Sequence, residues 1–396
     1  GRVAVKLLYV ATDQAVPGST GGSVHVEEVA RGLARRGHAV HVVAAPRGEM
    51  EPLAAGELEL HAARLLLPHR MFRWTAKGQM RRLIERLGVE LVLERYYNFA
   101  GEGIRAAYQK GIPSVLEVNS PVVDHPRSLK ARVDGALLFR PLRRLREEQC
   151  RKASAIVTPL PAILPPGVPR HKVHRIHWGA NVDRFRPGLM PSGPASRLPI
   201  PEGARVVVFS GSFRRWHGAD VLIRAAARVL AGPEAQKAFF LLLGSGPDRW
   251  RIVREVERLG IGTRVHMTGA VPHYEMPQYL ARCHVGVAPY QPSRHGQLQL
   301  GFYWSPLKVF EYMASGLPVV TLDIDPLREI VRQNREGLLV GEQDEEALAA
   351  AIETLIASPS RAEALGRSAR ERVVSLYSWQ VHCEKLEGLL RSLLGK

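Results

Sequence analysis

Short apolar runs, each followed by a turn and then by a segment of helical periodicity, recur along the chain. Near the start, the apolar run at residues 3–12 precedes the turn PGSTGGS, a helical segment at residues 23–37 and a second apolar run at residues 38–45. This order predicts a βαβ unit with parallel strands. Further strands are expected at residues 89–96, 112–119 and 154–159.

The same order begins again beyond a stretch rich in Pro, Gly and Ser at residues 187–203. Strands are expected at residues 204–213, 238–244, 264–269 and 284–290, with helices at residues 219–231, 249–260 and 274–283. We therefore predict an α/β fold of two Rossmann-like domains, residues 1–180 and 181–370. Ligands of open α/β sheets bind at the carboxyl ends of the strands, which predicts a cleft between the two domains.

The length, cysteine content and charge of the chain favour a globular protein of two domains. The 396 residues suit two globular domains, and the three cysteines have no metal-ligand or disulfide spacing, so a reducing cytoplasm is expected. No apolar run has the length of a membrane span, and the first twelve residues favour a buried strand over a signal peptide. Residues 1–180 hold 28 Lys/Arg against 16 Asp/Glu, a net charge of +12, and the remaining residues carry +5.

Much of the positive charge lies at residues 129–152, where leucines alternate with arginines. Two interpretations stay open: a helix that contacts an anionic membrane, and a helix whose basic face is solvated. The leucines are Leu137, Leu138, Leu142 and Leu145, and the arginines are Arg140, Arg143, Arg144 and Arg146.

The segment SPLKVFEYMASGLPVV, residues 305–320, carries the clearest chemistry. Pro306 suits the start of a helix, and Gly316 with Pro318 suits its end, so a helix is expected at residues 306–315. Its N-terminus favours an anion such as a diphosphate, and Lys308 adds a positive charge there. Glu311 lies further along the same helix, where a carboxylate can accept hydrogen bonds from ribose hydroxyls.

This segment resembles the signature of the retaining glycosyltransferases of family four, which have the GT-B fold. The resemblance implies that Glu311 binds the ribose and that the last helix, residues 371–396, returns to the first domain, with Trp379 packing there. Family members usually carry two glutamates that flank seven residues; Glu311 matches the second, and the first would lie at Tyr303. No Asp or Glu occurs between Val285 and Phe310. In the family the first glutamate holds the hydroxyls of the donor's sugar, so its absence leaves the identity of that sugar open.

The string GSFRRWHG, residues 211–218, resembles the family's diphosphate-binding loop. Where family members commonly have an arginine and a lysine that bind the diphosphate, this chain has Ser212 and His217. Arg214 and Arg215 lie between these two positions and could supply the positive charge. A glycine at Gly211 lets the backbone approach a phosphate closely. We expect His217 to be partly protonated and to donate a hydrogen bond.

Two further parts of the first domain match the family. Gly21 and Gly22 resemble its paired glycines, which approach the acceptor and the β-phosphate; a turn that needs positive φ is the structural alternative. His25, one helical turn on, is equally explained as a partly exposed helix residue. Asn119 stands where many relatives have a histidine that contacts the donor sugar.

Glu94 and Glu117 each follow an apolar run. They are either functional carboxylates at the edge of the cleft or buried carboxylates paired with a residue such as Arg95.

Three other motifs bear on the donor site or on metal binding. The turn at residues 269–272, with Val271 and Pro272, resembles the part of the family that contacts the base, with uracil preferred. The acidic pair in DID, residues 323–325, matches the metal-binding DxD of another glycosyltransferase fold, but its place after an apolar run favours a loop. His171, His174 and His177 are not expected to share a metal ion, because an odd spacing on a strand places side chains on opposite faces.

We thus predict a retaining, metal-independent glycosyltransferase with a nucleoside diphosphate sugar as donor, UDP-linked by preference, and no other cofactor. The alternatives are a sugar-nucleotide epimerase of the same fold and a non-enzymatic polyanion-binding protein, although no nucleic-acid module is present. The predicted catalytic residues are Asn119, Arg214, His217 and Lys308. The predicted donor-binding residues are Gly21, Gly22, Gly211, Ser212, Val271, Pro272, Tyr303, Ser305, Pro306, Leu307 and Glu311, and the acceptor-side residues are His25, Arg95 and Glu117.

Overall fold

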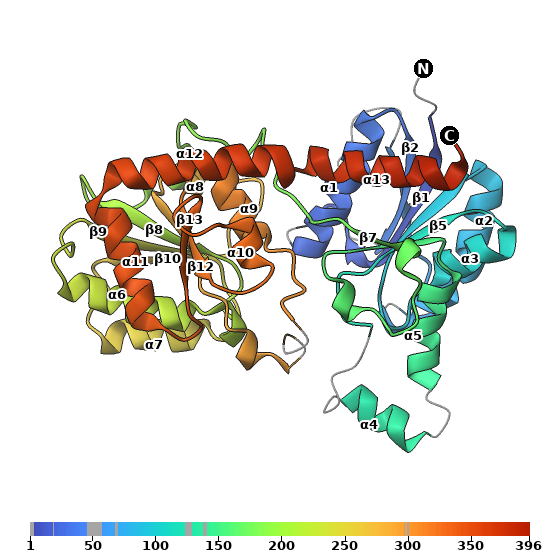
Figure 1. Cartoon of the computed structure of the whole chain (residues 1–396), viewed down its shortest axis with the longest axis horizontal. Coiled ribbons are helices and arrows are strands. Elements are labelled where there is room, and N and C mark those ends of the chain that lie inside the picture. Colours follow the sequence, from blue (N-terminus) through green and yellow to red (C-terminus); the bar gives the residue numbers. More distant parts are fainter. Residues whose placement is uncertain are drawn as a thin grey trace. The chain divides into compact units, whose positions relative to one another are not determined.

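The structure is a computed structural model that describes residues 4–18, 20–45, 58–67, 70–122, 129–137, 141–296, 298 and 301–396. The chain forms two compact units (Figure 1). Unit 1 holds the described residues up to Trp178, together with Tyr303–Ser305 and Trp379–Lys396, and unit 2 holds Gly179–Phe302 and Pro306–Ser378. The units therefore divide at 178/179 and 378/379, where the sequence predicted 180/181 and 370/371.

Unit 1 contains a seven-stranded parallel sheet with the order β3-β2-β1-β4-β5-β6-β7. The order reverses at β1, as in a doubly wound fold. The strands are β1 (Lys6–Ala15), β2 (Ala39–Ala45), β3 (Leu58–Ala62), β4 (Leu91–Arg95), β5 (Ser114–Glu117), β6 (Ala155–Thr158) and β7 (Val173–Arg175).

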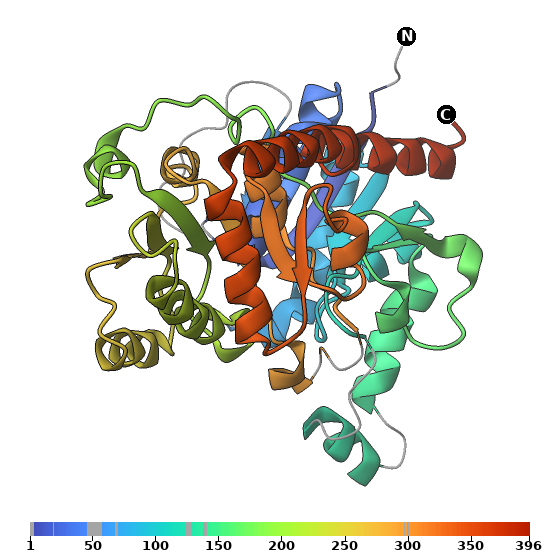
Figure 2. The ribbon, with the colours of Figure 1, turned by 60° about the vertical axis from the view of Figure 1, so that its left-hand side comes forward.

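Helices lie on both faces of this sheet (Figures 1 and 2). Alternate residues of β1 point to opposite faces: Tyr9 reaches α1, whereas Leu8 and Val10 pack against α2 and α3. The helices of unit 1 are α1 (Gly21–Arg35), α2 (Lys77–Leu87), α3 (Glu102–Lys110), α4 (Leu129–Ala136), α5 (Pro141–Lys152) and α13 (Trp379–Leu394), with short 3-10 helices η1 (Arg70–Ala76), η2 (Pro161–Ile163) and η3 (Arg170–Lys172).

Unit 2 contains a six-stranded parallel sheet with the order β10-β9-β8-β11-β12-β13. Its strands are β8 (Arg205–Ser210), β9 (Ala238–Leu243), β10 (Val265–Gly269), β11 (Val285–Ala288), β12 (Val319–Leu322) and β13 (Gly337–Val340). Residues of β8 and β9 are almost all buried, as expected for a parallel sheet covered on both faces.

The helices of unit 2 form a continuous series of contacts, in which α7 contacts α6, α6 contacts α11, α11 contacts α12 and α12 contacts α9. They are α6 (Ala219–Ala231), α7 (Arg249–Arg258), α8 (Met276–Leu280), α9 (Leu307–Ala314), α10 (Leu327–Ile330), α11 (Glu345–Ala357) and α12 (Pro359–Leu376), with 3-10 helices η4 (Gly193–Arg197), η5 (Arg215–His217) and η6 (Pro292–Arg294). The two Rossmann-like domains predicted from the sequence are confirmed.

The basic segment at residues 129–152 contains two helices rather than one. In Figures 1 and 2, α4 projects from the body of unit 1, and α5 follows it. Arg143 and Arg144 are exposed, but Arg146 is buried beside Asp134, with Nη2 3.5 Å from Oδ2, so the arginines do not form one solvated face. Leu138 and Arg140 lie outside the described residues. None of the helices in the described part of the chain combines the length and the apolar character needed to cross a bilayer.

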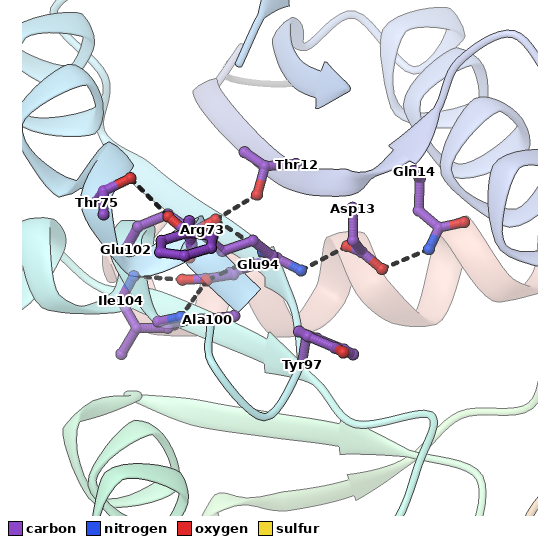
Figure 3. A network of polar contacts seen from close by, with 12 residues as sticks. Thr12, Asp13, Gln14, Arg73, Thr75, Glu94, Tyr97, Ala100, Glu102 and Ile104 are labelled. Atoms are coloured by element: carbon purple, nitrogen blue, oxygen red, sulfur yellow. Dashed lines mark hydrogen bonds and ion pairs between the residues drawn. The ribbon is translucent and has the colours of Figure 1, made fainter. Parts of the chain in front are cut away.

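A buried ion-pair network fixes the carboxyl ends of β1 and β4 in unit 1 (Figure 3). Arg73 of η1 is fully buried and pairs with three carboxylates. Its Nε donates to Glu102 at 2.9 Å and its Nη2 to Glu94 at 3.4 Å, and Nη1 donates to Asp13. Glu94 also accepts from the backbone N–H of Gly101 at 2.7 Å, and burial together with the nearby Glu102 raises the pKa of Glu94.

The alternative of a paired, buried carboxylate is therefore correct for Glu94, but its partner is Arg73 and not Arg95. The network holds the chain that leaves β1 against the chain that leaves β4.

Replacing Arg73 by Leu should lower the free energy of unfolding by about 3–5 kcal/mol, because it leaves Asp13 and Glu102 buried without a counter-charge. Urea denaturation followed by fluorescence measures this loss. As a matched control, Arg31→Ala removes a partly exposed i,i+4 pair with Glu27 and should cost less than about 1 kcal/mol. Equal losses in the two variants would contradict the structural role of Arg73.

Candidate functional site

Helix α9 begins and ends as the sequence predicted, within one residue at each end. Pro306 is the N-cap residue, and its carbonyl accepts from the N–H of Val309 at 2.8 Å. At the other end Gly316 has φ of 77°, and Arg370 of α12 donates to the carbonyl of Ala314 at 2.8 Å. The start of α9 is therefore held in unit 2 with its first N–H groups directed outwards along the helix axis.

Lys308 is the most unusual charged residue of the site. Its side chain is buried, and Nζ lies 4.3 Å from the ring centre of Phe209 and 5.1 Å from that of Tyr290. Among the described residues, no acceptor lies within hydrogen-bonding distance of Nζ. Burial lowers the pKa of Lys308 to about 7, with Glu311 acting in the opposite direction.

The loop at residues 211–218 connects β8 to α6 and passes directly beside this ammonium group. Gly211 has φ of 141°, and a Cβ placed on it would lie 2.6 Å from Nζ of Lys308. Gly218 has φ of 76°, and a Cβ there would overlap the carbonyl oxygen of Pro289. Both positions have positive φ, which favours glycine. At Gly211 the lack of a side chain also lets Lys308 approach closely, and at Gly218 it leaves room for the backbone of the turn that follows β11.

Two of the polar side chains predicted in this loop differ strongly in environment. Arg214 is exposed, and its guanidinium lies 5.4 Å from the ring centre of Trp216. Desolvation lowers the pKa of His217 to about 2, with further contributions from Lys308 and Arg214. The expectation of a partly protonated His217 is therefore wrong, and the imidazole is neutral at pH 7. Ser212 accepts a backbone hydrogen bond from Arg214 at 3.0 Å.

Glu311 has a partner that the sequence analysis missed. Nε2 of His273 lies 2.6 Å from Oε1 of Glu311. His273 directly follows Val271 and Pro272, so the turn beyond β10 reaches α9 through this side chain. Only the backbone of the turn was considered from the sequence, although the adjacent histidine was visible there.

Tyr303 and Ser305 group with unit 1 and not with the residues around Lys308. Tyr303 is buried, and burial raises the pKa of its hydroxyl to about 12. The hydroxyl of Ser305 accepts from the backbone N–H of Trp178 at 3.5 Å. No Asp or Glu lies between Val285 and Phe310, and position 303 holds a buried aromatic ring.

In unit 1, Gly21 and Gly22 are the first two residues of α1 and do not have positive φ. The alternative that explained them by a positive-φ turn is therefore wrong. A Cβ on Gly22 would run into the side chain of Gln14 and would lie 3.2 Å from Nη2 of Arg95. A larger residue at Gly22 would therefore displace the ends of the Gln14 and Arg95 side chains.

His25 is fully buried, which corrects the expectation of a partly exposed helix residue. Its ring stacks on Trp178, with centroids 4.4 Å apart and an interplanar angle of 9°. Nη1 of Arg95 donates to Nδ1 of His25 at 3.1 Å, so Nδ1 carries no proton. Burial and the positive charge of Arg95 both lower the pKa of His25.

The predicted residues of β5 meet the same cluster. Glu117 accepts from the hydroxyl of Tyr9 at 2.5 Å, and Nε2 of His25 lies 3.5 Å from its other oxygen. Burial raises the pKa of Glu117 to about 7. Oδ1 of Asn119 accepts from Nε1–H of Trp178 at 3.1 Å, while Nδ2 has no partner among the described residues. His25, Arg95, Glu117 and Asn119 are therefore brought together at one end of the unit 1 sheet.

The remaining motifs have structural roles. Asp323 and Asp325 lie in the loop between β12 and α10, and Nε of Arg328 is 3.2 and 3.6 Å from their carboxylates. The loop interpretation of this pair is confirmed. His174 lies in β7, whereas His177 lies beyond it, where its carbonyl is 2.7 Å from Nδ1 of His382.

Each of the two units matches the model of one protein-domain family. Residues 19–184 match the model described as "Glycosyltransferase Family 4", and residues 204–358 match "Glycosyl transferases group 1". "D-inositol 3-phosphate glycosyltransferase 1" of Catenulispora acidiphila is 29% identical over 58% of this chain and 53% of its own. The enzyme of that name from Thermobifida fusca is 26% identical over 98% of this chain and 92% of its own. The chain spans about half the length of most of the curated relatives it matches first.

Solved structures share the fold over nearly the whole chain. Sucrose-phosphate synthase from Thermosynechococcus elongatus has a TM-score of 0.75 and 22% identity, with 99% of each chain covered. Anabaena Alr3699/HepE in complex with UDP has a TM-score of 0.71 and 16% identity, with 98% of this chain and 100% of that chain covered. The architecture is that of the GT-B fold, and each of the two units matches a glycosyltransferase domain model.

Proposed function

We propose that the protein transfers a sugar from a nucleoside diphosphate donor, a UDP-sugar by preference, to a hydroxyl acceptor. The observation that carries this proposal is the buried ammonium group of Lys308. A buried charge without a partner destabilises a fold, so its presence beside Gly211 and the start of α9 is best explained by an anionic ligand. The complexes of Anabaena HepE with UDP and UDP-glucose support a diphosphate donor as that ligand.

In this proposal unit 2 binds the donor. Lys308, Arg214 and the N-terminal N–H groups of α9 stabilise the negative charge that grows on the departing diphosphate. Neutral His217 donates a hydrogen bond and no charge. Glu311, oriented by His273, accepts from the ribose hydroxyls. The backbone at Gly211, Ser212, Val271, Pro272, Pro306 and Leu307 completes the donor site.

The chemistry requires no protein nucleophile. The departing diphosphate removes the proton of the acceptor hydroxyl on the face where the bond to the sugar breaks, and the anomeric configuration is retained. The proposed transfer step does not use a metal ion, so a chelator should not change the rate of sugar transfer. In unit 1 we assign Asn119, through its free Nδ2, to the donor sugar, Gly21 and Gly22 to the donor as well, and Arg95 with the buried pair His25 and Glu117 to the acceptor side.

Two further proposals concern where the protein works. The three cysteines are free and buried, which agrees with a reducing compartment such as the cytoplasm. Exposed Val133 and Leu137 accompany exposed Arg143 and Arg144, which agrees with contact to an anionic leaflet. Failure to sediment with acidic vesicles at low salt would remove the membrane contact.

Incubation with radiolabelled UDP-sugars distinguishes the proposed activity from its rivals. We expect slow release of UDP without acceptor, as water replaces the hydroxyl, and faster release when the correct acceptor is supplied. Inversion of a sugar centre without UDP release would instead indicate an epimerase. Absence of both binding and turnover across the common donors would contradict a UDP-sugar transferase.

Replacing Glu311 by Ala should weaken UDP binding at least tenfold, because the ribose loses its carboxylate acceptor. Arg214→Ala should also raise the dissociation constant at least tenfold, because the diphosphate loses a cation. Isothermal titration calorimetry measures both. Arg361→Ala, which removes an exposed arginine of α12 that donates to Asn334, is the matched control and should bind as the parent does. Unchanged binding in Arg214→Ala would remove Arg214 from the site.

A further inference from the structure

Two histidines and a glutamate gather at the edge of the unit 1 sheet, away from the residues assigned to the reaction. The parallel register pairs His41 of β2 with Glu59 of β3, and Val43 with His61. Side chains of paired residues, and of residues two apart on a strand, project from the same face. His41, Glu59 and His61 therefore share one face of two adjacent strands, and β3 is the edge strand.

The separations of their ligand atoms match a tetrahedral metal site. Nε2 of His61 lies 3.3 Å from Nδ1 of His41, Oε2 of Glu59 lies 3.1 Å from that Nδ1, and Oε1 of Glu59 lies 3.8 Å from Nε2 of His61. Zinc binds imidazole nitrogen at about 2.0–2.1 Å and carboxylate oxygen at about 2.0–2.2 Å, which separates tetrahedral ligands by roughly 3.3–3.5 Å. The three side chains can thus surround one ion with only small rotations.

The protonation state of the histidines also suits a metal. Burial lowers the pKa values of both His41 and His61, which favours neutral rings, and each neutral ring offers one nitrogen with a free lone pair. Glu59 provides a negative charge, and its side chain is 59% exposed, which leaves the site open to solvent. The positive charges of Lys6 and Arg86 act on these histidines as well and weaken the attraction for a cation.

The ligand atoms of a second group, His25, Glu117 and His382, also lie within 4.8 Å of one another, but the protonation of His25 does not suit a metal. Because Arg95 donates to Nδ1 of His25, the proton of that neutral ring is on Nε2, the atom that faces Glu117. A nitrogen that carries a proton cannot bind a metal. In the edge group, the hydrogen bond between Nε2 of His61 and Nδ1 of His41 also leaves a proton on one of these two nitrogens. Among the described contacts, however, no guanidinium donates to the other nitrogen of either ring, so this proton can move there when a metal binds.

We propose that His41, Glu59 and His61 bind one divalent ion of the zinc class, with water in the fourth position. Two imidazoles and one carboxylate favour Zn²⁺, Co²⁺ or Cu²⁺ over Mg²⁺ or Ca²⁺. The ion joins the edge strand β3 to β2. This proposal is independent of the glycosyltransferase activity.

Equilibrium dialysis of the untagged, full-length protein against Zn²⁺ at pH 7.5 tests the proposal. We expect one equivalent per chain, and Co²⁺ should give the intense visible absorption of tetrahedral coordination. His41→Ala and His61→Ala should each weaken binding at least tenfold and abolish the Co²⁺ spectrum, while Mg²⁺ should not compete.

His171→Ala is the matched control, because it removes an exposed histidine of unit 1 outside the group. It should bind Zn²⁺ as the parent does. Circular dichroism of the metal-free variants confirms that each one folds, so that lost binding reports the ligand and not the fold. Binding that is absent from the parent, or retained equally in His41→Ala and His61→Ala, would overturn the proposal.

Discussion

The burial of a single ammonium group, that of Lys308, is the constraint around which unit 2 is organised. Helix α9 carries this lysine, and several contacts fix the position of the helix. The hydroxyl of Tyr312 accepts from the backbone N–H of Ser210 at 2.7 Å, and Gly286 of β11 leaves room for the ring, because a Cβ there would lie 2.5 Å from it. Arg370 binds the last carbonyl of α9. The ammonium group is therefore held against Gly211 by the packing of the helix and by the rings of Phe209 and Tyr290, and among the described residues it has no hydrogen-bond acceptor.

Buried charges in unit 1 follow the opposite principle. Arg73 is surrounded by three carboxylates, and Glu94 accepts further hydrogen bonds from the backbone. Such a network is satisfied internally, so it stabilises one arrangement of the chain ends beyond β1 and β4. Arg73 therefore has a structural role, and the contrast with Lys308 supports the ligand-binding role proposed for that lysine.

The strands and helices that could be predicted were those with a strong local signal. The run of residues 238–244 and the helix at residues 219–231 are apolar or periodic enough to be recognised alone, and α6 has the bounds that were predicted. The polar helices α2 and α3 and the edge strand β3 were not predicted, because half-buried elements carry fewer apolar residues. The division of residues 129–152 into α4 and α5 depends on the buried pair of Arg146 and Asp134, which are 12 residues apart.

The sequence predicts which residues form the candidate site better than it predicts their protonation states and contacts. The positions of Lys308, Glu311 and the loop at residues 211–218 followed from turn and helix signals. Their protonation states did not, because the low pKa of His217 results from desolvation and from Lys308, which is distant in the sequence. The contact between His273 and Glu311 likewise joins two elements 38 residues apart.

Proton uptake on UDP binding tests the central claim most directly. At pH 8 UDP is fully ionised, since the second pKa of a phosphate ester is about 6. Lys308, with a pKa of about 7, is then neutral in about nine of ten free molecules. A diphosphate favours the charged form and raises this pKa, so affinity should fall as the pH rises above 7. Calorimetry in buffers of different ionisation enthalpy should show uptake of nearly one proton per UDP bound at pH 8. Binding of UDP with no proton uptake would contradict the account.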